Sequence, residues 1–89
     1  MRTEDVRARV RAQIAEHAAV PVERVESGMS LTADLPLDSL QLYELAASLE
    51  DEFGLGELDE EAVAGIETVG DVEDRVLERL PAGNLTGGG

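Results

Sequence analysis

Tyr43 and Phe53 are the only aromatic residues in this chain of 89 residues. Because β-sheets favour aromatic and β-branched side chains, a core made mainly of Leu, Val, Ile and Ala is more typical of packed helices. The chain is short enough for one small domain, which we place at residues 1–81, with residues 82–89 as a flexible tail. We therefore predict a one-domain, all-α protein.

Acidic residues dominate the charge of the chain. Twenty acids against seven arginines, with no lysine, give a formal net charge of −13. Residues 1–37 carry five arginines and six acids, whereas residues 38–89 carry two arginines and fourteen acids. Because nucleic acids and anionic membranes bind cationic surfaces, both are excluded as partners. No stretch approaches the roughly 20 apolar residues of a membrane span and the N-terminus is charged, so we expect a cytoplasmic monomer.

The chain lacks most side chains of self-contained catalysis. It has no cysteine and no lysine, which excludes a disulfide framework, a thiolate nucleophile, a zinc–thiolate site and a Schiff base. Its one histidine, His17, lies close to the apolar stripe of a predicted helix, so we expect it at the edge of a bundle. We predict neither catalytic nor metal-binding residues.

Apolar spacing and capping signals predict four helices. They cover residues 4–18, 39–53, about 59–65 and 68–80. The connection over residues 19–38 would be long for a structureless loop, but it holds several apolar residues. We expect an ordered loop that is pinned to the bundle by Val20, Val22, Val25, Met29, Leu31 and Leu35.

Three of these helices are predicted to start with a capping residue. Thr3 is expected to cap the first helix. Asp38 is expected to cap the second, where Gln41 can complete a reciprocal exchange. Thr68 and Asp71 match the capping box of the last helix. Each cap fixes the residue at which its helix begins.

The helix over residues 39–53 has more apolar residues than one core face needs. One face holds Leu42, Leu45, Ala46, Leu49 and Phe53 at helical spacing. The other side holds what we name the docking face: Leu40, Tyr43, Glu44, Ala47, Glu50 and Asp51. An apolar patch rimmed by charge is typical of an interaction site. The alternative is that Leu40 and Tyr43 pack beneath the connection over residues 19–38.

Ser39 begins this helix directly after Asp38. Its neighbours Leu37 and Gln41 are not the glycines of a G-x-S-x-G nucleophile elbow, and only His17 could act as a base. We therefore do not expect intrinsic serine chemistry. A serine that cannot activate itself can still be modified by another enzyme.

The residues around Ser39 resemble the acyl carrier protein family. Residues 34–40 (DLPLDSL) are similar to the family's D-L-G-x-D-S-L, and residues 49–53 (LEDEF) are similar to its L-E-x-E-F. Residues 59–62 (DEEA) and 66–69 (IETV) resemble its third helix and the entry to its fourth. The ordered combination is much more specific than any one piece, and the resemblance extends over about residues 4–80.

This resemblance implies a four-helix bundle with a long ordered loop between the first two helices and a short third helix. It also implies that a 4′-phosphopantetheine arm from coenzyme A is esterified to Ser39, with Asp38 as part of the motif and as the helix cap. The thiol of the arm would carry an acyl group as a thioester. The implied partners are a phosphopantetheinyl transferase and either an acyltransferase and ketosynthase or an adenylating ligase, which would bind the docking face of a non-catalytic carrier.

The chain departs from the family pattern by one extra residue within residues 56–58 and by three replacements near Ser39. Pro36 replaces a glycine, Leu37 replaces a residue that is often small and is expected to add bulk beside the arm, and Tyr43 replaces an aliphatic residue. These departures, with the absence of lysine, favour a specialised polyketide-type pathway over housekeeping fatty-acid synthesis. Two alternatives stay open: a discrete peptidyl or aminoacyl carrier of the same fold, and an unmodified acidic interaction domain in which Ser39 only begins a helix.

Overall fold

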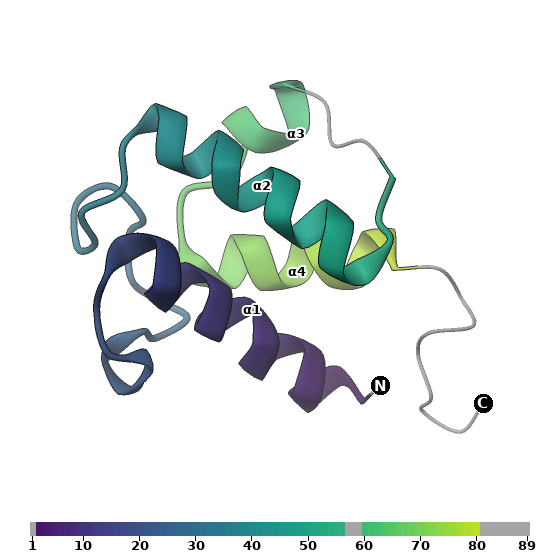
Figure 1. Cartoon of the computed structure of the whole chain (residues 1–89), viewed down its shortest axis with the longest axis horizontal. Coiled ribbons are helices and arrows are strands. Elements are labelled where there is room, and N and C mark those ends of the chain that lie inside the picture. The colour runs from purple at the N-terminus through teal and green to yellow at the C-terminus, as the bar shows by residue number, and fades with distance from the viewer. Residues whose placement is uncertain (1, 57–59, 81–89) are drawn as a thin grey trace.

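Three long helices and one short helix make up most of the regular structure (Figure 1). The computed structural model describes residues 2–56 and 60–80, without the side chains of residues 60 and 62. The elements are α1 (Thr3–Ala18), the single turn η1 (Val22–Arg24), α2 (Ser39–Phe53), α3 (Glu60–Ala64) and α4 (Val69–Arg79). Within the described ranges the only β pairing is one isolated bridge, between Ser30 and Thr68. The all-α prediction is confirmed, while the predicted tail over residues 82–89 lies outside the described residues.

Reciprocal capping boxes begin α2 and α4. Asp38 Oδ1 accepts a hydrogen bond from Gln41 N–H at 2.8 Å, and Gln41 Oε1 accepts one from Asp38 N–H at 3.0 Å. Thr68 Oγ1 accepts from Asp71 N–H at 3.1 Å, and Asp71 Oδ2 accepts from Thr68 N–H at 3.0 Å. Each exchange satisfies two backbone amides that have no carbonyl partner within their own helix. Both predicted capping boxes are confirmed, and the first makes Ser39 the opening residue of α2.

The predicted Thr3 cap of α1 is wrong. Thr3 lies inside the helix, and Arg2 occupies the cap position in an extended conformation without a side-chain hydrogen bond. Val6 N–H already donates to the Arg2 carbonyl at 2.9 Å, so the helix starts one residue early. Glu4 and Asp5 lie in its first turn, where negative charge interacts favourably with the helix dipole.

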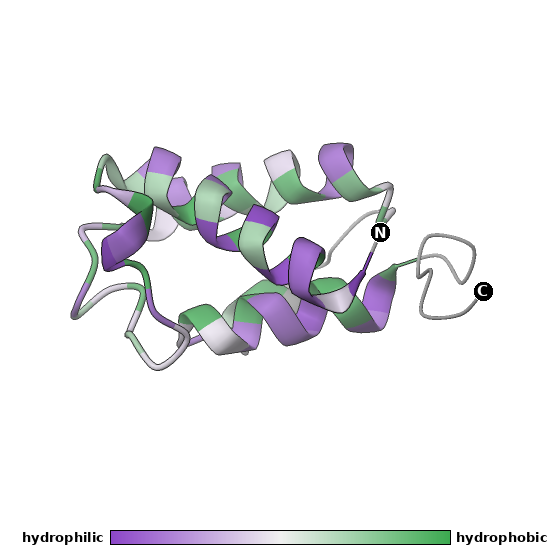
Figure 2. Ribbon diagram, turned by 90° about the horizontal axis from the view of Figure 1, so that it is seen from below, coloured by the Kyte–Doolittle hydropathy of each residue, from purple (hydrophilic) through white to green (hydrophobic). Residues whose placement is uncertain are grey.

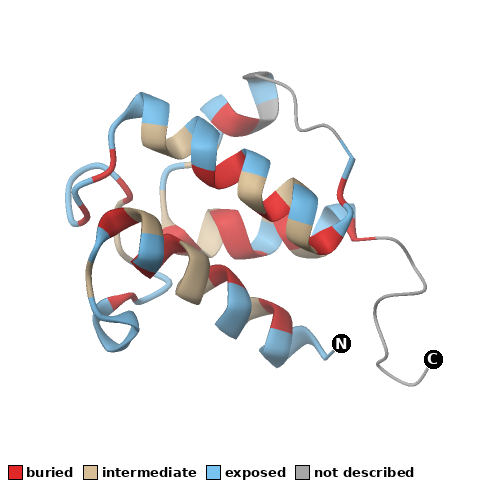
Figure 3. Cartoon of the chain, viewed as in Figure 1, coloured by how far each residue is buried: buried red, intermediate tan, exposed pale blue. Residues whose placement is uncertain are grey.

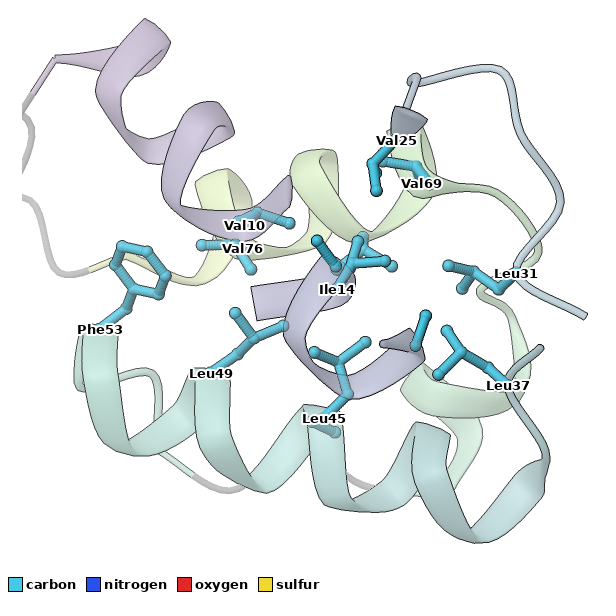
Figure 4. Packing of buried hydrophobic residues seen from close by; sticks show 14 of the residues in the cluster. Val10, Ile14, Val25, Leu31, Leu37, Leu45, Leu49, Phe53, Val69 and Val76 are labelled. Atoms are coloured by element: carbon cyan, nitrogen blue, oxygen red, sulfur yellow. The ribbon is translucent and has the colours of Figure 1, made fainter. Parts of the chain in front are cut away.

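One hydrophobic core fills the space between the long helices. α1 packs against α2 and α4, and α3 contacts α2. Each long helix is banded with hydrophobic and hydrophilic residues (Figure 2), so each turns one apolar stripe inward. Figure 4 shows Leu45, Leu49 and Phe53 pointing from α2 into this core. Phe53 is the one buried aromatic side chain among the described residues, as the scarcity of aromatic residues predicts.

The connection between α1 and α2 is hydrogen-bonded to the start of α4. Leu31 N–H donates to the Glu67 carbonyl at 3.0 Å, and Gly70 N–H donates to the Ser27 carbonyl at 2.7 Å. A Cβ atom at Gly70 would lie only 3.1 Å from that Ser27 oxygen, so this close approach favours glycine. These bonds hold the connection at the end of the bundle from which α2 begins.

Most apolar residues of the connection reach the core, but one does not. The buried members are Val25, Leu31, Leu35 and Leu37. Val22 is 44% exposed, so the expectation that it pins the connection is wrong. Val22 is the first residue of the η1 turn, and Val25, which follows the turn, is the residue that packs into the core.

Candidate cofactor attachment site

Ser39 is exposed at the first position of α2. The Asp38 capping box fixes the direction in which the chain enters the helix. The Ser39 neighbours Asp38 and Leu40 are also exposed, and Figure 3 shows the start of α2 in pale blue at the upper left. The Ser39 hydroxyl is therefore accessible to another enzyme.

The start of α2 leaves two backbone amides without an intrahelical partner. The first intrahelical bond runs from Leu42 N–H to the Asp38 carbonyl at 3.0 Å, and Asp38 Oδ1 occupies the amide of Gln41. The amides of Ser39 and Leu40 precede both bonds, at the positive end of the helix dipole. Such a terminus suits an anionic group attached to the neighbouring hydroxyl.

The predicted docking face lies on the outer side of α2. Leu40 and Tyr43 are 67% and 45% exposed, so they do not pack beneath the connection over residues 19–38. The remaining members are exposed except Glu50, which is half-buried: Glu44, Ala47, Glu50 and Asp51. Two large apolar side chains thus lie within one turn of Ser39, with carboxylates along the same helix.

Leu37 does not lie where the sequence placed it. Its side chain is 4% exposed and belongs to the core, and Figure 4 shows it directed inward. Its N–H donates to the Leu35 carbonyl at 2.9 Å, a tight turn that directs the two leucines into the core while Pro36 stays exposed. The expectation that Leu37 adds bulk beside the arm is therefore wrong, because core burial accounts for this side chain.

An apolar cleft between α2 and α4 opens one turn beyond Ser39. We call it the α2–α4 cleft; it has a volume of about 20 Å³. Its walls include Leu42, Leu45 and Leu49 of α2 with Val72, Arg75 and Val76 of α4. The sequence assigned these leucines to the core and did not predict a cleft. In the structure Leu42, an apolar residue of the predicted core face, is only half-buried, and nothing in the sequence distinguishes it from its buried neighbours.

His17 takes no part in this site. It is half-buried near the end of α1, and its Nδ1 lies 3.0 Å from the Gln13 carbonyl. This placement is consistent with the predicted position at the edge of the bundle.

Comparisons with known proteins identify the class and then the family. A family model described as "Phosphopantetheine attachment site" matches residues 8–76. An acyl carrier protein of Saccharopolyspora erythraea is 39% identical over 70 residues, which cover 79% of this chain and 73% of the relative. An acyl carrier protein of Phenylobacterium zucineum is 40% identical over 78 residues, which cover 88% and 98%. The solved structure of the acyl carrier protein from Enterococcus faecalis matches with a TM-score of 0.73 and 33% identity, covering 89% and 99%.

The chain therefore belongs to the acyl carrier protein family. It is a non-catalytic carrier, and its cofactor is a covalently attached phosphopantetheine group. The predicted family, the non-enzymatic role and the cofactor are thereby confirmed. The start of α2 fits this group, because it combines an accessible hydroxyl with two amides that favour a phosphodiester.

Proposed function

We propose that the phosphopantetheine arm is attached to Ser39 and carries acyl or polyketide intermediates as thioesters. The observation that supports this most directly is the exposed Ser39 hydroxyl at the opening of α2, behind the Asp38 cap. The arm supplies the thiol that holds the cargo, which agrees with a chain that has no cysteine. Ser39 is thus the point from which cargo reaches partner enzymes.

The residues around Ser39 position the arm and do not activate the hydroxyl. Asp38 and Gln41 hold the first turn in place, and the amides of Ser39 and Leu40 favour the phosphodiester by roughly 0.3–1 kcal/mol. The only histidine is bonded to the Gln13 carbonyl, so deprotonation of the hydroxyl is left to the transferase.

Incubation with coenzyme A and a broad-range phosphopantetheinyl transferase tests the attachment site. Intact mass should rise by one phosphopantetheine group in the unmodified sequence and in Ser30→Ala, a serine change in the connection. Ser39→Ala should gain nothing. If Ser39→Ala still gains this mass, the arm is attached to another residue. If no variant gains mass, the protein is an unmodified interaction domain.

We propose that partner enzymes bind the docking face. Its apolar centre, Leu40 and Tyr43, is exposed beside Ser39, and the acids Glu44 and Asp51 are exposed on the same helix. These acids favour partners with basic surfaces and act mainly on the association rate. The transferase, and an acyltransferase or ketosynthase, are the partners that we propose.

We propose that the cargo is an intermediate of a specialised polyketide-type pathway. It is supported by Pro36 in place of the family's glycine and by Tyr43 as an exposed aromatic residue on the docking face. Mass spectrometry of the protein from its native host would weigh arm and cargo together. A polyketide intermediate supports the proposal, a saturated fatty acyl chain argues for fatty-acid synthesis, and an aminoacyl group argues for a peptidyl carrier.

We further propose that α1, α2, α3 and α4 form a four-helix carrier bundle in which α3 is the short third helix and the connection is an ordered loop over one end. The carrier domain would span residues 1–81 and work as a cytoplasmic monomer. In support, the family match over residues 8–76 falls inside these limits, and large exposed apolar residues are few in the described ranges: Val22, Leu40 and Tyr43. No helix in those ranges is long and apolar enough to cross a membrane.

A further inference from the structure

Tyr43 lies one helical turn after Ser39 on α2. Residues four apart in an α-helix have Cβ atoms about 5–6 Å from each other, and each side chain leans towards the N-terminus of the helix. A side chain at position 43 therefore covers the turn that Ser39 begins. Both side chains are open to solvent, since Ser39 is exposed and Tyr43 is 45% exposed. The phenol and a group attached to the Ser39 hydroxyl thus share one patch of surface.

The Tyr43 hydroxyl has no acceptor in the part of the chain that the structure describes. It forms no hydrogen bond with any residue of those ranges. The positions three and four residues away, which are its neighbours on the helix surface, hold Ser39, Leu40, Ala46 and Ala47. None of these side chains carries a carboxylate that would compete for the phenol O–H. Tyr43 therefore offers a hydrogen-bond donor beside the start of α2.

We propose that Tyr43 positions the phosphopantetheine arm: its hydroxyl donates a hydrogen bond to the phosphodiester at Ser39. The unesterified oxygens of the phosphodiester share a negative charge, and hydrogen bonds to charged acceptors are stronger than those to neutral ones. The two unbonded amides at the start of α2 donate from the backbone, and Tyr43 adds a side-chain donor from the next turn. This inference rests on the proposed attachment at Ser39 and names a further residue that holds the arm.

The alternative is that Tyr43 only contacts partner enzymes as part of the docking face. The two roles use different parts of the side chain. A contact with a partner uses the exposed ring, which phenylalanine also provides, and it does not depend on whether the arm is present. A bond to the phosphodiester uses the hydroxyl and exists only in the loaded protein. Removing the hydroxyl alone therefore separates the two roles.

Tyr43→Phe makes this change, and it is compared with the original sequence before and after loading. The arm is transferred from coenzyme A, and intact mass verifies the loading. Thermal unfolding is measured for each of the four proteins, and phosphorus NMR for the two loaded ones. Because Tyr43 is the only tyrosine, its Cζ gives a single tyrosine carbon resonance to follow on loading. A control combines Tyr43→Phe with Ala47→Tyr, which moves the phenol to an exposed position one turn further from Ser39.

Loading should raise the melting temperature of the original sequence about 3 °C more than that of Tyr43→Phe. Loading should also shift the Tyr43 Cζ resonance, and the phosphorus resonance should differ between the original sequence and Tyr43→Phe. The combined variant should keep the phosphorus resonance of Tyr43→Phe.

Three results would overturn the inference while leaving attachment at Ser39 intact. They are equal increases in melting temperature on loading, one phosphorus resonance shared by the original sequence and Tyr43→Phe, and a combined variant that restores the original phosphorus resonance. In each case Tyr43 acts through its ring alone. Failure to load any arm at Ser39 would overturn the proposed function first, and this inference with it.

Discussion

Arg7 on α1 places Nη1 2.9 Å from Oε1 of Glu73 on α4, and the Glu73 side chain is 0% exposed. The Ser27 hydroxyl donates to the same oxygen at 2.8 Å, and Arg11 Nε lies 3.5 Å from Oε2. Glu73 is the only charged residue buried among those that the structure describes. A carboxylate removed from water needs such partners, so this cluster links α1, the connection and α4.

The two sides of this ion pair should respond differently to mutation. Arg7→Leu leaves a buried carboxylate with fewer partners, and we expect a loss of about 2–3 kcal/mol in the free energy of unfolding. Glu73→Leu removes the buried charge, and Arg7 and Arg11, which are 37% and 38% exposed, can return to water. We expect that change to cost less than about 1 kcal/mol.

Urea unfolding of the two variants at neutral pH measures this difference. Asp74→Ala serves as the control, because Asp74 is the exposed second partner of Arg7 and such pairs contribute about 0–1 kcal/mol. Equal losses for Arg7→Leu and Glu73→Leu would show that the contact stabilises the fold as a pair, and the desolvation argument would then be wrong.

The sequence contained part of the signal for this cluster. Glu73 follows Val69 by four residues and precedes Val76 by three, so helical spacing places it on the apolar face of α4. The hydrogen-bond partners of Glu73 come from α1 and from the connection, 66 and 46 residues away along the chain. A single sequence has no rule that pairs such distant residues, whereas the capping boxes at Asp38 and Thr68 are local and could be predicted.

The candidate site shows the same division between local and distant information. The D-S-L motif and helical spacing sufficed to place Ser39 at a helix start and Leu40 on an outer face. The inward turn of Leu37 and the cleft beside Arg75 depend on how α2, α4 and the connection pack together. Sequence patterns therefore predict which residues begin and line a helix, and the packing decides which of them enclose a cleft.

Asp38 caps α2 and also lies next to Ser39, the proposed attachment residue, and two substitutions separate these two roles. Asp38→Ala removes the acceptor for Gln41 N–H and should lower the free energy of unfolding by about 1 kcal/mol. Asp38→Asn retains an acceptor and should stay within about 0.5 kcal/mol. Denaturant unfolding and the rate of arm transfer are measured on both. If transfer slows equally in both variants, the charge of Asp38 matters to the transferase, and if it slows only in Asp38→Ala, the cap alone matters.

Charge on the docking face should control how fast partners associate. Glu44→Lys and Asp51→Lys should each slow arm transfer about threefold at low ionic strength, since exposed charge pairs contribute about 0.2–1 kcal/mol each. Added salt should slow the unmodified sequence and reduce the difference between variants. Glu16→Lys makes the same charge change at an exposed position on α1 and should leave the rate unchanged. If neither the two substitutions nor added salt changes the rate of arm transfer, these acids serve only to keep the protein soluble.

Asp71 should contribute stability that depends on pH. Backbone N–H groups of Glu67 and Thr68 donate to its carboxylate at 3.0 Å each and hold the pKa of Asp71 below its usual value. Because folding favours the charged form, this stability is fully present above the unfolded pKa, near about 3.9. It is lost as the pH falls through the lower, folded pKa.

Asp71→Asn should therefore lower the free energy of unfolding by about 1 kcal/mol at neutral pH, with a gap to the original sequence that narrows in acid. Urea midpoints between pH 7 and about 3 measure this gap. Glu78→Gln is the matched control, since Glu78 is exposed on the same helix and has no hydrogen-bond partner in the described ranges. The free energy of unfolding of Glu78→Gln should stay within about 0.5 kcal/mol of the original sequence over the whole pH range. An Asp71→Asn gap of constant size would mean that the carboxamide loses hydrogen bonds but that the charge contributes nothing to the cap.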